Sequence, residues 1–205
     1  MEIGKSTEND VPTIMRIYAA ARRFMAEHGN PNQWGPTNWP PERLIRSDIA
    51  SGESYVCRAG GKIVGTFCFR MGADAEPAYR AIEQGSWRDP SPYGVVHRLA
   101  SDGSVRGVGR ACIEWAFAQC GHLRIDTHPD NTVMQDLLAK TGFTRCGVIH
   151  VVEDDNPRFA YERVAAAGES MGARPTTFVL RPLSFVFCPR TEDTGQRTKD
   201  LGLWT

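Results

Sequence analysis

The sequence predicts an α/β domain of ordinary size, and three observations carry that prediction. Strand-like and helix-like hydrophobic patterns alternate from residue 2 to about residue 164. A glycine-rich loop joins one of those strands directly to a helix. The chain has 205 residues, of which 41% are hydrophobic and 23% charged, and these proportions are typical of a soluble protein with one core.

The overall charge and the cysteines argue against several classes of protein. The chain carries 24 lysines and arginines against 24 acidic residues, so its formal net charge is zero and we expect no nucleic-acid partner. The sequence has no run of 18 apolar residues and no apolar signal-peptide core, so we expect no membrane association. Six cysteines without a CxxC pair predict a reduced, cytoplasmic protein.

Each element of the N-terminal half follows from a local pattern. Apolar residues at steps of three and four after the capping residues Asn9 and Asp10 predict the first helix. A turn at residues 59–61 joins two strands as a hairpin. The polar stretch from Met71 to Pro92 predicts a long excursion outside the core. The expected elements are a strand at 2–7, a helix to about 27, a helix from 41 to about 52, and strands at 54–58 and 62–70.

The second half continues the alternation. Apolar residues at helical spacing follow the glycine-rich loop at 102–109, and Asn131 caps a later helix that Gly142 closes. The expected elements are a strand at 94–101, a helix from about 108, a strand at 122–128, a helix from 131 to 142, and strands near 143–152 and 158–164.

The pattern stops after Val164, so we predict a domain over residues 1–164 and an appendage over residues 165–205. Residues 165–170 have the composition of a linker, and residues 176–188 form an isolated apolar run. Such a run favours aggregation unless a surface covers it, and a homodimer interface is one candidate. We expect deletion of the appendage to leave the domain folded and to alter its association.

The glycine-rich loop carries the strongest chemical signal. A helix N-terminus exposes unpaired N–H groups and a partial positive charge, and Gly107 and Gly109 let the chain approach a phosphate closely. Arg106 and Arg110 add charge-assisted hydrogen bonds. The segment predicts a pyrophosphate site, with a simple helix cap as the alternative. A dinucleotide-binding fingerprint matches poorly, because Cys112 stands where its third glycine belongs.

Two motifs carry a family resemblance. Arg106, Gly109 and Ala111 satisfy the loop pattern Q/R-x-x-G-x-G/A in register, and Asn131 followed by residues 140–143 (Lys-Thr-Gly-Phe) matches an N…K-x-G-F signature. With the order of the expected elements, these motifs resemble the GNAT acetyltransferase superfamily over residues 1–164. The resemblance implies a mixed, mostly antiparallel sheet with helices on both faces, and it does not cover the appendage.

By that resemblance the co-substrate is acetyl-CoA. The loop amides would hold its pyrophosphate, and the strand edge before the loop would pair with its pantetheine arm. The start of the later helix would flank the arm near the thioester. The residues implied are Leu99, Ala100, Ser101, Val105, Arg106, Gly107, Val108, Gly109, Arg110, Ala111, Asn131 and Met134.

Acetyl transfer to an amine needs a base, a polarised thioester carbonyl and a proton for the leaving thiolate. Many members of the resembled family carry a glutamate two residues before the position of Leu99, where this chain has His97. A histidine is suited to act as a base near neutral pH, and the alternative is that it lines the cleft or satisfies a backbone group. The usual acid tyrosine corresponds to Leu138, which cannot donate a proton. Another group protonates the thiolate, or it leaves without help.

The strand at 122–128 places four polar residues on one face. Of these, Asp126 and His128 are candidates for binding the amine or assisting His97, and a solvated strand end is the alternative. We expect no metal, because no third and fourth ligand stand at suitable spacing.

The loop between the first two helices contains Gln33, Trp34 and Trp39. This region covers the acceptor in the resembled family, so we expect these residues to contact substrate; anchoring of the loop is an equal alternative. Cys112 lies on the apolar helix face, so we favour direct attack by the amine in a ternary complex over an acetyl-cysteine intermediate.

The sequence therefore predicts an acetyl-CoA-dependent N-acetyltransferase acting on a primary amine of a small molecule or on an exposed amino group. One alternative is a module that binds acetyl-CoA or CoA without turnover, because His97 and Leu138 depart from the usual pattern. A nucleotide-dependent oxidoreductase is a third hypothesis, which the missing glycine weakens.

Overall fold

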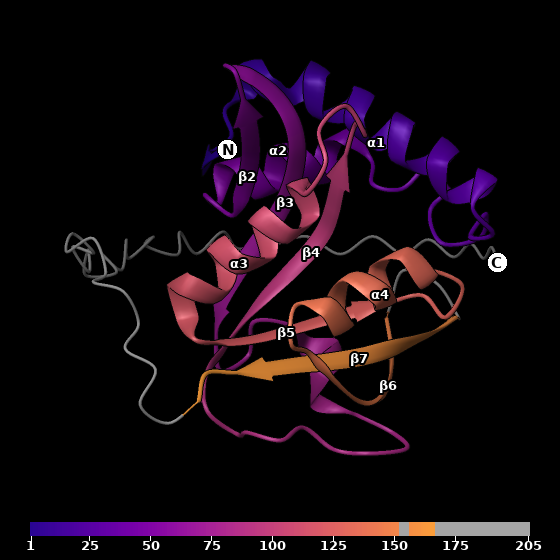
Figure 1. The fold of residues 1–205 in the computed structure, drawn as a ribbon, viewed down its shortest axis with the longest axis vertical. Coiled ribbons are helices and arrows are strands. Elements are labelled where there is room, and N and C mark those ends of the chain that lie inside the picture. The colour runs from indigo at the N-terminus through magenta and orange to yellow at the C-terminus, as the bar shows by residue number, and fades with distance from the viewer. Residues whose placement is uncertain (152–155, 167–205) are drawn as a thin grey trace, which may run out of the picture. The chain divides into compact units, whose positions relative to one another are not determined.

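The structure, a computed structural model, describes residues 1–151 and 156–166. Its helices and strands follow the order that the sequence predicts, with boundaries that differ by a few residues (Figure 1). They are β1 (Glu2–Lys5), η1 (Glu8–Asp10), α1 (Val11–Glu27), α2 (Glu42–Ala50), β2 (Ser54–Ala59), β3 (Lys62–Gly72), η2 (Pro77–Arg80), β4 (Tyr93–Ser101), α3 (Val108–Cys120), β5 (His122–Thr127), α4 (Thr132–Lys140), β6 (Thr144–His150) and β7 (Pro157–Val164).

The seven described strands form one mixed sheet in the order β1-β2-β3-β4-β5-β7-β6. The pair β4–β5 is parallel, and the other neighbouring pairs are antiparallel. β4 and β5 share two register pairs, Gly94 with Leu123 and Val95 with Arg124. Beyond these pairs the strands diverge, as Figure 1 shows. The predicted fold class is confirmed, and the divergence opens the middle of the sheet.

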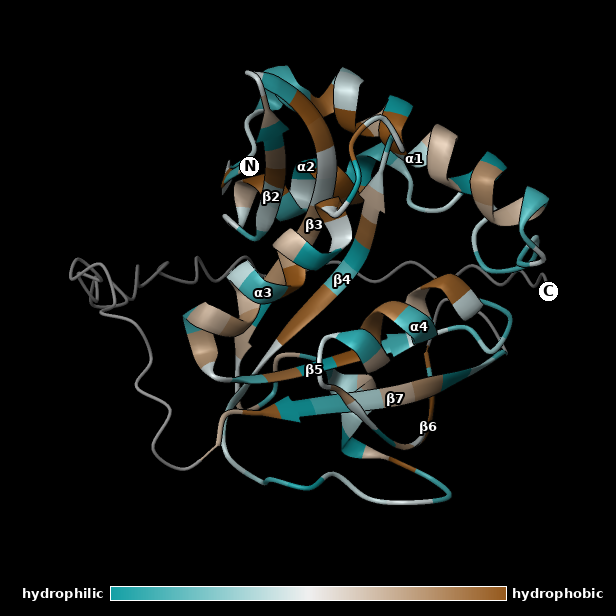
Figure 2. Cartoon of the chain, viewed as in Figure 1, coloured by the Kyte–Doolittle hydropathy of each residue, from teal (hydrophilic) through white to brown (hydrophobic). Residues whose placement is uncertain are grey.

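Helices cover both faces of the sheet because successive strand residues point to opposite sides. Val56 of β2 packs with Ile14 of α1 and Ile45 of α2. The next residue, Cys57, packs with Cys112 of α3 on the other face. Figure 2 shows α1 banded in brown and teal, as expected of a helix with one buried and one exposed face.

β4 contains an irregularity at the point where it leaves β5. Arg98 has a φ of +54°, which is uncommon for a residue with a side chain, and the register with β3 shifts next to it. Two side chains hold this conformation. The Tyr18 hydroxyl donates to the Arg98 carbonyl at 3.1 Å, and Arg98 Nη2 donates to the buried carboxylate of Asp48 at 2.6 Å. The bulge is therefore fixed from α1 and from α2.

The stretch from Met71 to Pro92 was expected to lie outside the core, and this expectation is wrong. It contains η2, whose Tyr79 is 1% exposed and packs with Tyr93, Val95 and other residues in a third apolar cluster. Trp87 Nε1 donates to the Tyr79 carbonyl at 2.8 Å. The excursion is thus anchored by buried aromatic side chains that its polar composition hides.

The predicted appendage lies almost wholly outside the described residues, as does its predicted role in association. Among the residues that the structure describes, no helix is long and apolar enough to cross a membrane.

Candidate active site

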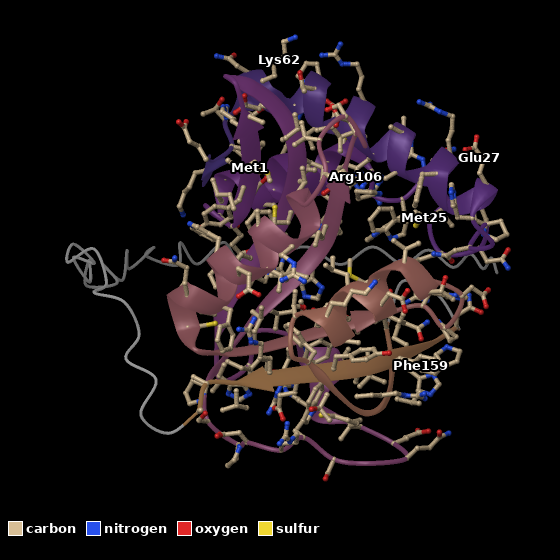
Figure 3. All side chains as sticks on the ribbon, in the orientation of Figure 1. Met1, Met25, Glu27, Lys62, Arg106 and Phe159 are labelled. Atoms are coloured by element: carbon tan, nitrogen blue, oxygen red, sulfur yellow. The ribbon has the colours of Figure 1, made fainter. Side chains whose placement is uncertain are left out.

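A cavity of about 970 Å³ opens where β4 and β5 diverge. Its walls come from α1 and the loop after it, from β4 and β5, from the glycine-rich loop, and from the start of α4. Figure 3 labels two of its lining residues, Arg106 on the glycine-rich loop and Met25 on α1. A cavity of this size is large enough for an extended ligand and a second small molecule.

One end of the cavity is bounded by the N-terminus of α3. Gly107 is the N-cap and has a φ of +84°, a conformation that favours glycine. The first helical bond runs from the Ala111 N–H to the Gly107 carbonyl, so the amides of residues 107–110 have no acceptor within the helix. These amides and Arg106, which lines the cavity, make this end suitable for a phosphate group.

Three residues of the predicted cofactor set do not line the cavity. Val108 is buried in the core under β3 and β4, and Ala111 follows it inside the helix. Arg110 donates instead to the Lys140 carbonyl at the end of α4, at 3.3 Å. Leu99, Ala100, Ser101, Val105, Arg106, Gly107, Gly109, Asn131 and Met134 do line the cavity.

The loop after α1 closes the cavity on another side, and Gln33, Trp34 and Trp39 all line it. Trp34 also packs edge-on against Tyr18, with ring centroids 5.8 Å apart, so it both anchors the loop and forms a wall. The Gln33 amide oxygen accepts a hydrogen bond from Asn131 Nδ2 at 3.0 Å. Asn131 caps α4 through its own oxygen, which accepts the Met134 N–H. A short chain of amides therefore joins the loop to α4.

His97 lies on β4 beside the bulge and lines the cavity. Its Nε2 is 3.1 Å from Oε2 of Glu76, and both side chains are less than one-fifth exposed. Burial alone would raise the pKa of Glu76, but the His97 ring, the Ala78 amide and the charge of Arg70 lower that pKa below its ordinary value. Glu76 is therefore a carboxylate at neutral pH.

Asp126 of β5 also lines the cavity. Its Oδ1 accepts a hydrogen bond from the Tyr79 hydroxyl at 2.7 Å, and its Oδ2 lies 4.0 Å from Arg158 Nε. Burial, followed by the nearby Asp126 charge, raises the pKa of Tyr79 well above its ordinary value, so Tyr79 stays a hydroxyl donor. His128 does not line the cavity; its Nδ1 accepts the Asp130 N–H in the turn after β5.

The other polar residues on this face of β5, His122 and Arg124, pair with Glu162 of the neighbouring strand β7. The Glu162 carboxylate of β7 is fully buried and accepts from Arg124 Nε at 2.9 Å, and it lies 2.9 Å from His122 Nε2. The Arg88 N–H donates to its second oxygen at 2.6 Å. The predicted polar face is real, but this part of it is an internal ion-pair network.

The described residues include one group with the spacing of metal ligands, formed by Asp48, Glu53 and Cys68. Arg98 and Arg70 pair with the two carboxylates. The negative charges of Asp48 and Glu53 are thus already balanced by guanidinium groups, so we assign this cluster a structural role.

The comparison with protein families decides the identity of this fold. The acetyltransferase (GNAT) family model matches residues 16–143, which is more than half of the chain. The chain belongs to the GNAT acetyltransferase family. It is accordingly an acyltransferase, and the nucleotide-dependent oxidoreductase hypothesis is not retained. No sequence among the curated proteins matches the chain significantly.

Solved structures agree with this assignment. A GNAT-family acetyltransferase from Streptococcus agalactiae is 27% identical, with a TM-score of 0.73 over 81% of this chain and 96% of that one. A putative acetyltransferase from Staphylococcus aureus is 20% identical, with a TM-score of 0.57 over 80% and 99%. The ribosomal-protein-S18-alanine N-acetyltransferase from Escherichia coli is 15% identical, with a TM-score of 0.53 over 82% and 97%, and shows the fold alone.

Sequence reasoning missed three polar residues near this site. Glu76 and Arg158 line the cavity, and the Tyr79 hydroxyl donates a hydrogen bond to Asp126, which also lines it. A signal for Tyr79 existed, because Tyr79 and Trp87 are two large aromatic residues in a stretch otherwise assigned to solvent. Glu76 had no comparable signal, because its partner lies 21 residues further along the chain.

Proposed function

We propose that this acetyltransferase transfers the acetyl group of acetyl-CoA to a primary amine, on a small molecule or an exposed amino group, within a ternary complex. The observation that carries the proposal is a single cavity that joins the α3 N-terminus to His97 and Asp126. Acetyl-CoA, when bound, supplies the acetyl group as a thioester.

The residues at one end of the cavity fit the anionic part of acetyl-CoA. The amides of residues 107–110 and the Arg106 guanidinium would hold a pyrophosphate. The edge of β4 at Leu99–Ser101 faces the opening left by β5 and would pair with the amides of an extended arm. Gly109 contributes by its small size, because a Cβ there would lie 2.9 Å from Leu137 Cδ2 and that side chain would have to shift.

His97 is the candidate base. It lines the same cavity as Asp126, whose carboxylate would attract the ammonium form of the acceptor. The bound ammonium first loses one proton to solvent, which frees the lone pair of the amine. As the amine nitrogen then bonds to the acetyl carbon, the carbon–sulfur bond breaks, its electron pair stays on sulfur, and a second proton of that nitrogen moves to the His97 ring. We leave His128 out of this mechanism because it lies outside the cavity lining.

Two further residues bear on the route of transfer. Burial raises the pKa of Cys112, which is 0% exposed and lies in the core, so a direct transfer is favoured over an acetyl-cysteine intermediate. Leu138, at the position of the family's usual acid, is also 0% exposed and packs in the same core. The thiolate therefore leaves without a proton from this position of α4.

A thermal-shift titration with acetyl-CoA, desulfo-CoA and NAD tests the binding half of the proposal. A ligand at 100 times its Kd stabilises the native state by about 2.7 kcal/mol. We expect stabilisation by the two CoA compounds and not by NAD, and a weaker effect in Arg106→Glu. Lys62→Glu on the distant β2–β3 hairpin makes the same charge change and should bind as the wild type does.

Release of the CoA thiol with a panel of amino acids, arylalkylamines, polyamines and peptides tests turnover. We expect at least one amine to be acetylated, and His97→Gln to reduce that rate by about 10²–10⁴-fold. Stabilisation by acetyl-CoA without turnover of any amine would favour the binding module. Full turnover in His97→Gln would remove His97 as the base.

A further inference from the structure

We propose that Glu76 is a positioning residue for acetyl transfer, which fixes the tautomer of His97 so that Nδ1 receives the proton of the acceptor amine. This inference rests on the proposed function, because it assigns a partner to the base proposed there. It starts from an arrangement in which one short segment, residues 76–80, reaches both polar groups of the cavity.

Residues 76–80 are held firmly by Tyr79. Tyr79 is 1% exposed, its ring stacks on Tyr93 with centroids 6.2 Å apart, and its carbonyl accepts the Trp87 ring N–H. Its hydroxyl is bound to Asp126. A segment anchored by a buried aromatic ring and three such contacts places the neighbouring Glu76 reproducibly, although most of the excursion around it is polar.

The Glu76 carboxylate is oriented by its own segment and lies against His97. Its Oε1 accepts the Ala78 N–H at 3.1 Å, which restricts rotation of the carboxylate and leaves Oε2 for His97. Oε2 is 3.1 Å from His97 Nε2, a buried ring nitrogen that is within reach of this carboxylate but forms no aligned hydrogen bond among the described residues. Catalytic hydrogen bonds commonly become aligned only when substrate binds. Within the described residues, His97 Nδ1 has no hydrogen-bond partner. A carboxylate at Nε2 selects the tautomer that carries its proton there and leaves Nδ1 as the acceptor.

Several elements present charged and polar groups to the His97 imidazole. Glu76, the N-cap of η2, contacts it, and the Tyr79 ring of η2 has its centroid 6.4 Å from that of His97. Asp126 of β5 and Arg158 of β7 lie in the same cavity and partly neutralise each other. The strand partner on β3 is the buried thiol of Cys68, and the Arg70 charge acts on Glu76. Glu76 is the carboxylate in direct contact with the ring, so it also stabilises the imidazolium that forms during transfer.

The test compares two substitutions of Glu76. Glu76→Leu removes the acceptor, and Glu76→Gln keeps an acceptor oxygen without the charge. We expect Glu76→Leu to lower kcat at least tenfold with the best amine from the panel, and Glu76→Gln to restore part of that loss. Glu83→Gln is the matched control, because Glu83 forms an exposed pair with His150 outside the cavity, at 3.8 Å, and should leave kcat unchanged.

Nitrogen-15 spectra of the histidine rings give a readout that does not depend on activity. At pH 8 we expect His97 to show the Nε2–H tautomer in the wild type and in Glu76→Gln, and a mixture of tautomers in Glu76→Leu. The signals of buried His122 report whether each variant is folded. Unchanged tautomer and kcat in Glu76→Leu would overturn this inference while leaving His97 as the base. A wild-type rate in His97→Gln would instead remove His97 as the base and this inference with it, whereas absence of turnover with every amine would overturn the proposed function.

Discussion

Replacement of Asp48 by asparagine is expected to destabilise the protein by about 3–5 kcal/mol, the cost of leaving a buried charge without its partner. The Asp48 side chain is 3% exposed and that of Arg98 is 9% exposed, and Arg70 Nη2 lies 3.5 Å from the second Asp48 oxygen. An asparagine keeps one acceptor but turns an NH₂ group toward these donors. The loss therefore includes both the ion pair and the hydrogen bonding of a guanidinium that water barely reaches.

The same helix supplies a control. Glu42 pairs with Arg46 on the exposed face of α2, with side chains 53% and 48% exposed, and exposed pairs contribute about 0–1 kcal/mol. Urea unfolding followed by circular dichroism should separate Asp48→Asn from Glu42→Gln by at least 2 kcal/mol. In an Arg98→Gly background, which removes both the guanidinium and the cost of a positive φ, Asp48→Asn should cost less. If the free energies of unfolding of Asp48→Asn and Glu42→Gln differ by less than about 1 kcal/mol, burial does not decide how much these ion pairs stabilise the protein.

Two other predictions concern packing and pH. A Cβ at Gly65 would overlap Cγ1 of Val108 at the start of α3, so Gly65→Ala should lower the free energy of unfolding in urea by about 1–3 kcal/mol. Adding Val108→Ala removes the overlapping methyl group and should recover part of that loss. If the two substitutions destabilise the protein additively, this account of the overlap is wrong. Burial alone would raise the pKa of Glu162, but bonds from His122, the Arg88 amide and Arg124 lower it below the ordinary value of 4.5. Its contribution to stability is therefore present above about pH 4.5 and is lost as the pH falls through the depressed pKa. Glu162→Gln should destabilise the protein at pH 7 and flatten the acid side of its stability curve, and a curve of unchanged shape would contradict this.

Local signals explain why much of the fold could be predicted. Asn131 caps α4 through a bond to the Met134 amide three residues away, and Gly142 adopts a φ of +80° just after that helix, so both features are decided by neighbouring residues. The glycine-rich loop is equally local. Its sequence predicts the free amides of α3, although it does not show that Arg110 turns toward the end of α4.

The part of the cavity lined by His97 and Asp126 depends on contacts that no local pattern encodes. Glu76 meets His97 across 21 positions of sequence, and Tyr79 meets Asp126 across 47. The alternation of side chains along β5 correctly predicts that Asp126 shares a face with His122 and Arg124. The sequence of β5 does not show that Glu162 on the adjacent strand pairs with those two residues and leaves Asp126 to the cavity. His128 follows the last residue of β5, where the turn takes it out of the alternation.

The hydrogen bond between Gln33 and Asn131 has a thermodynamic consequence. Gln33 belongs to the loop that would contact the acceptor under the proposed function, and Asn131 caps the helix that would flank acetyl-CoA. A ligand that strains or tightens this bond from one side changes the free energy of the site on the other side. Linkage requires the effect to be reciprocal, so each substrate would alter the affinity for the other by the same factor. Under the proposed function, this amide contact is therefore a direct link through which the two substrates would affect each other's binding.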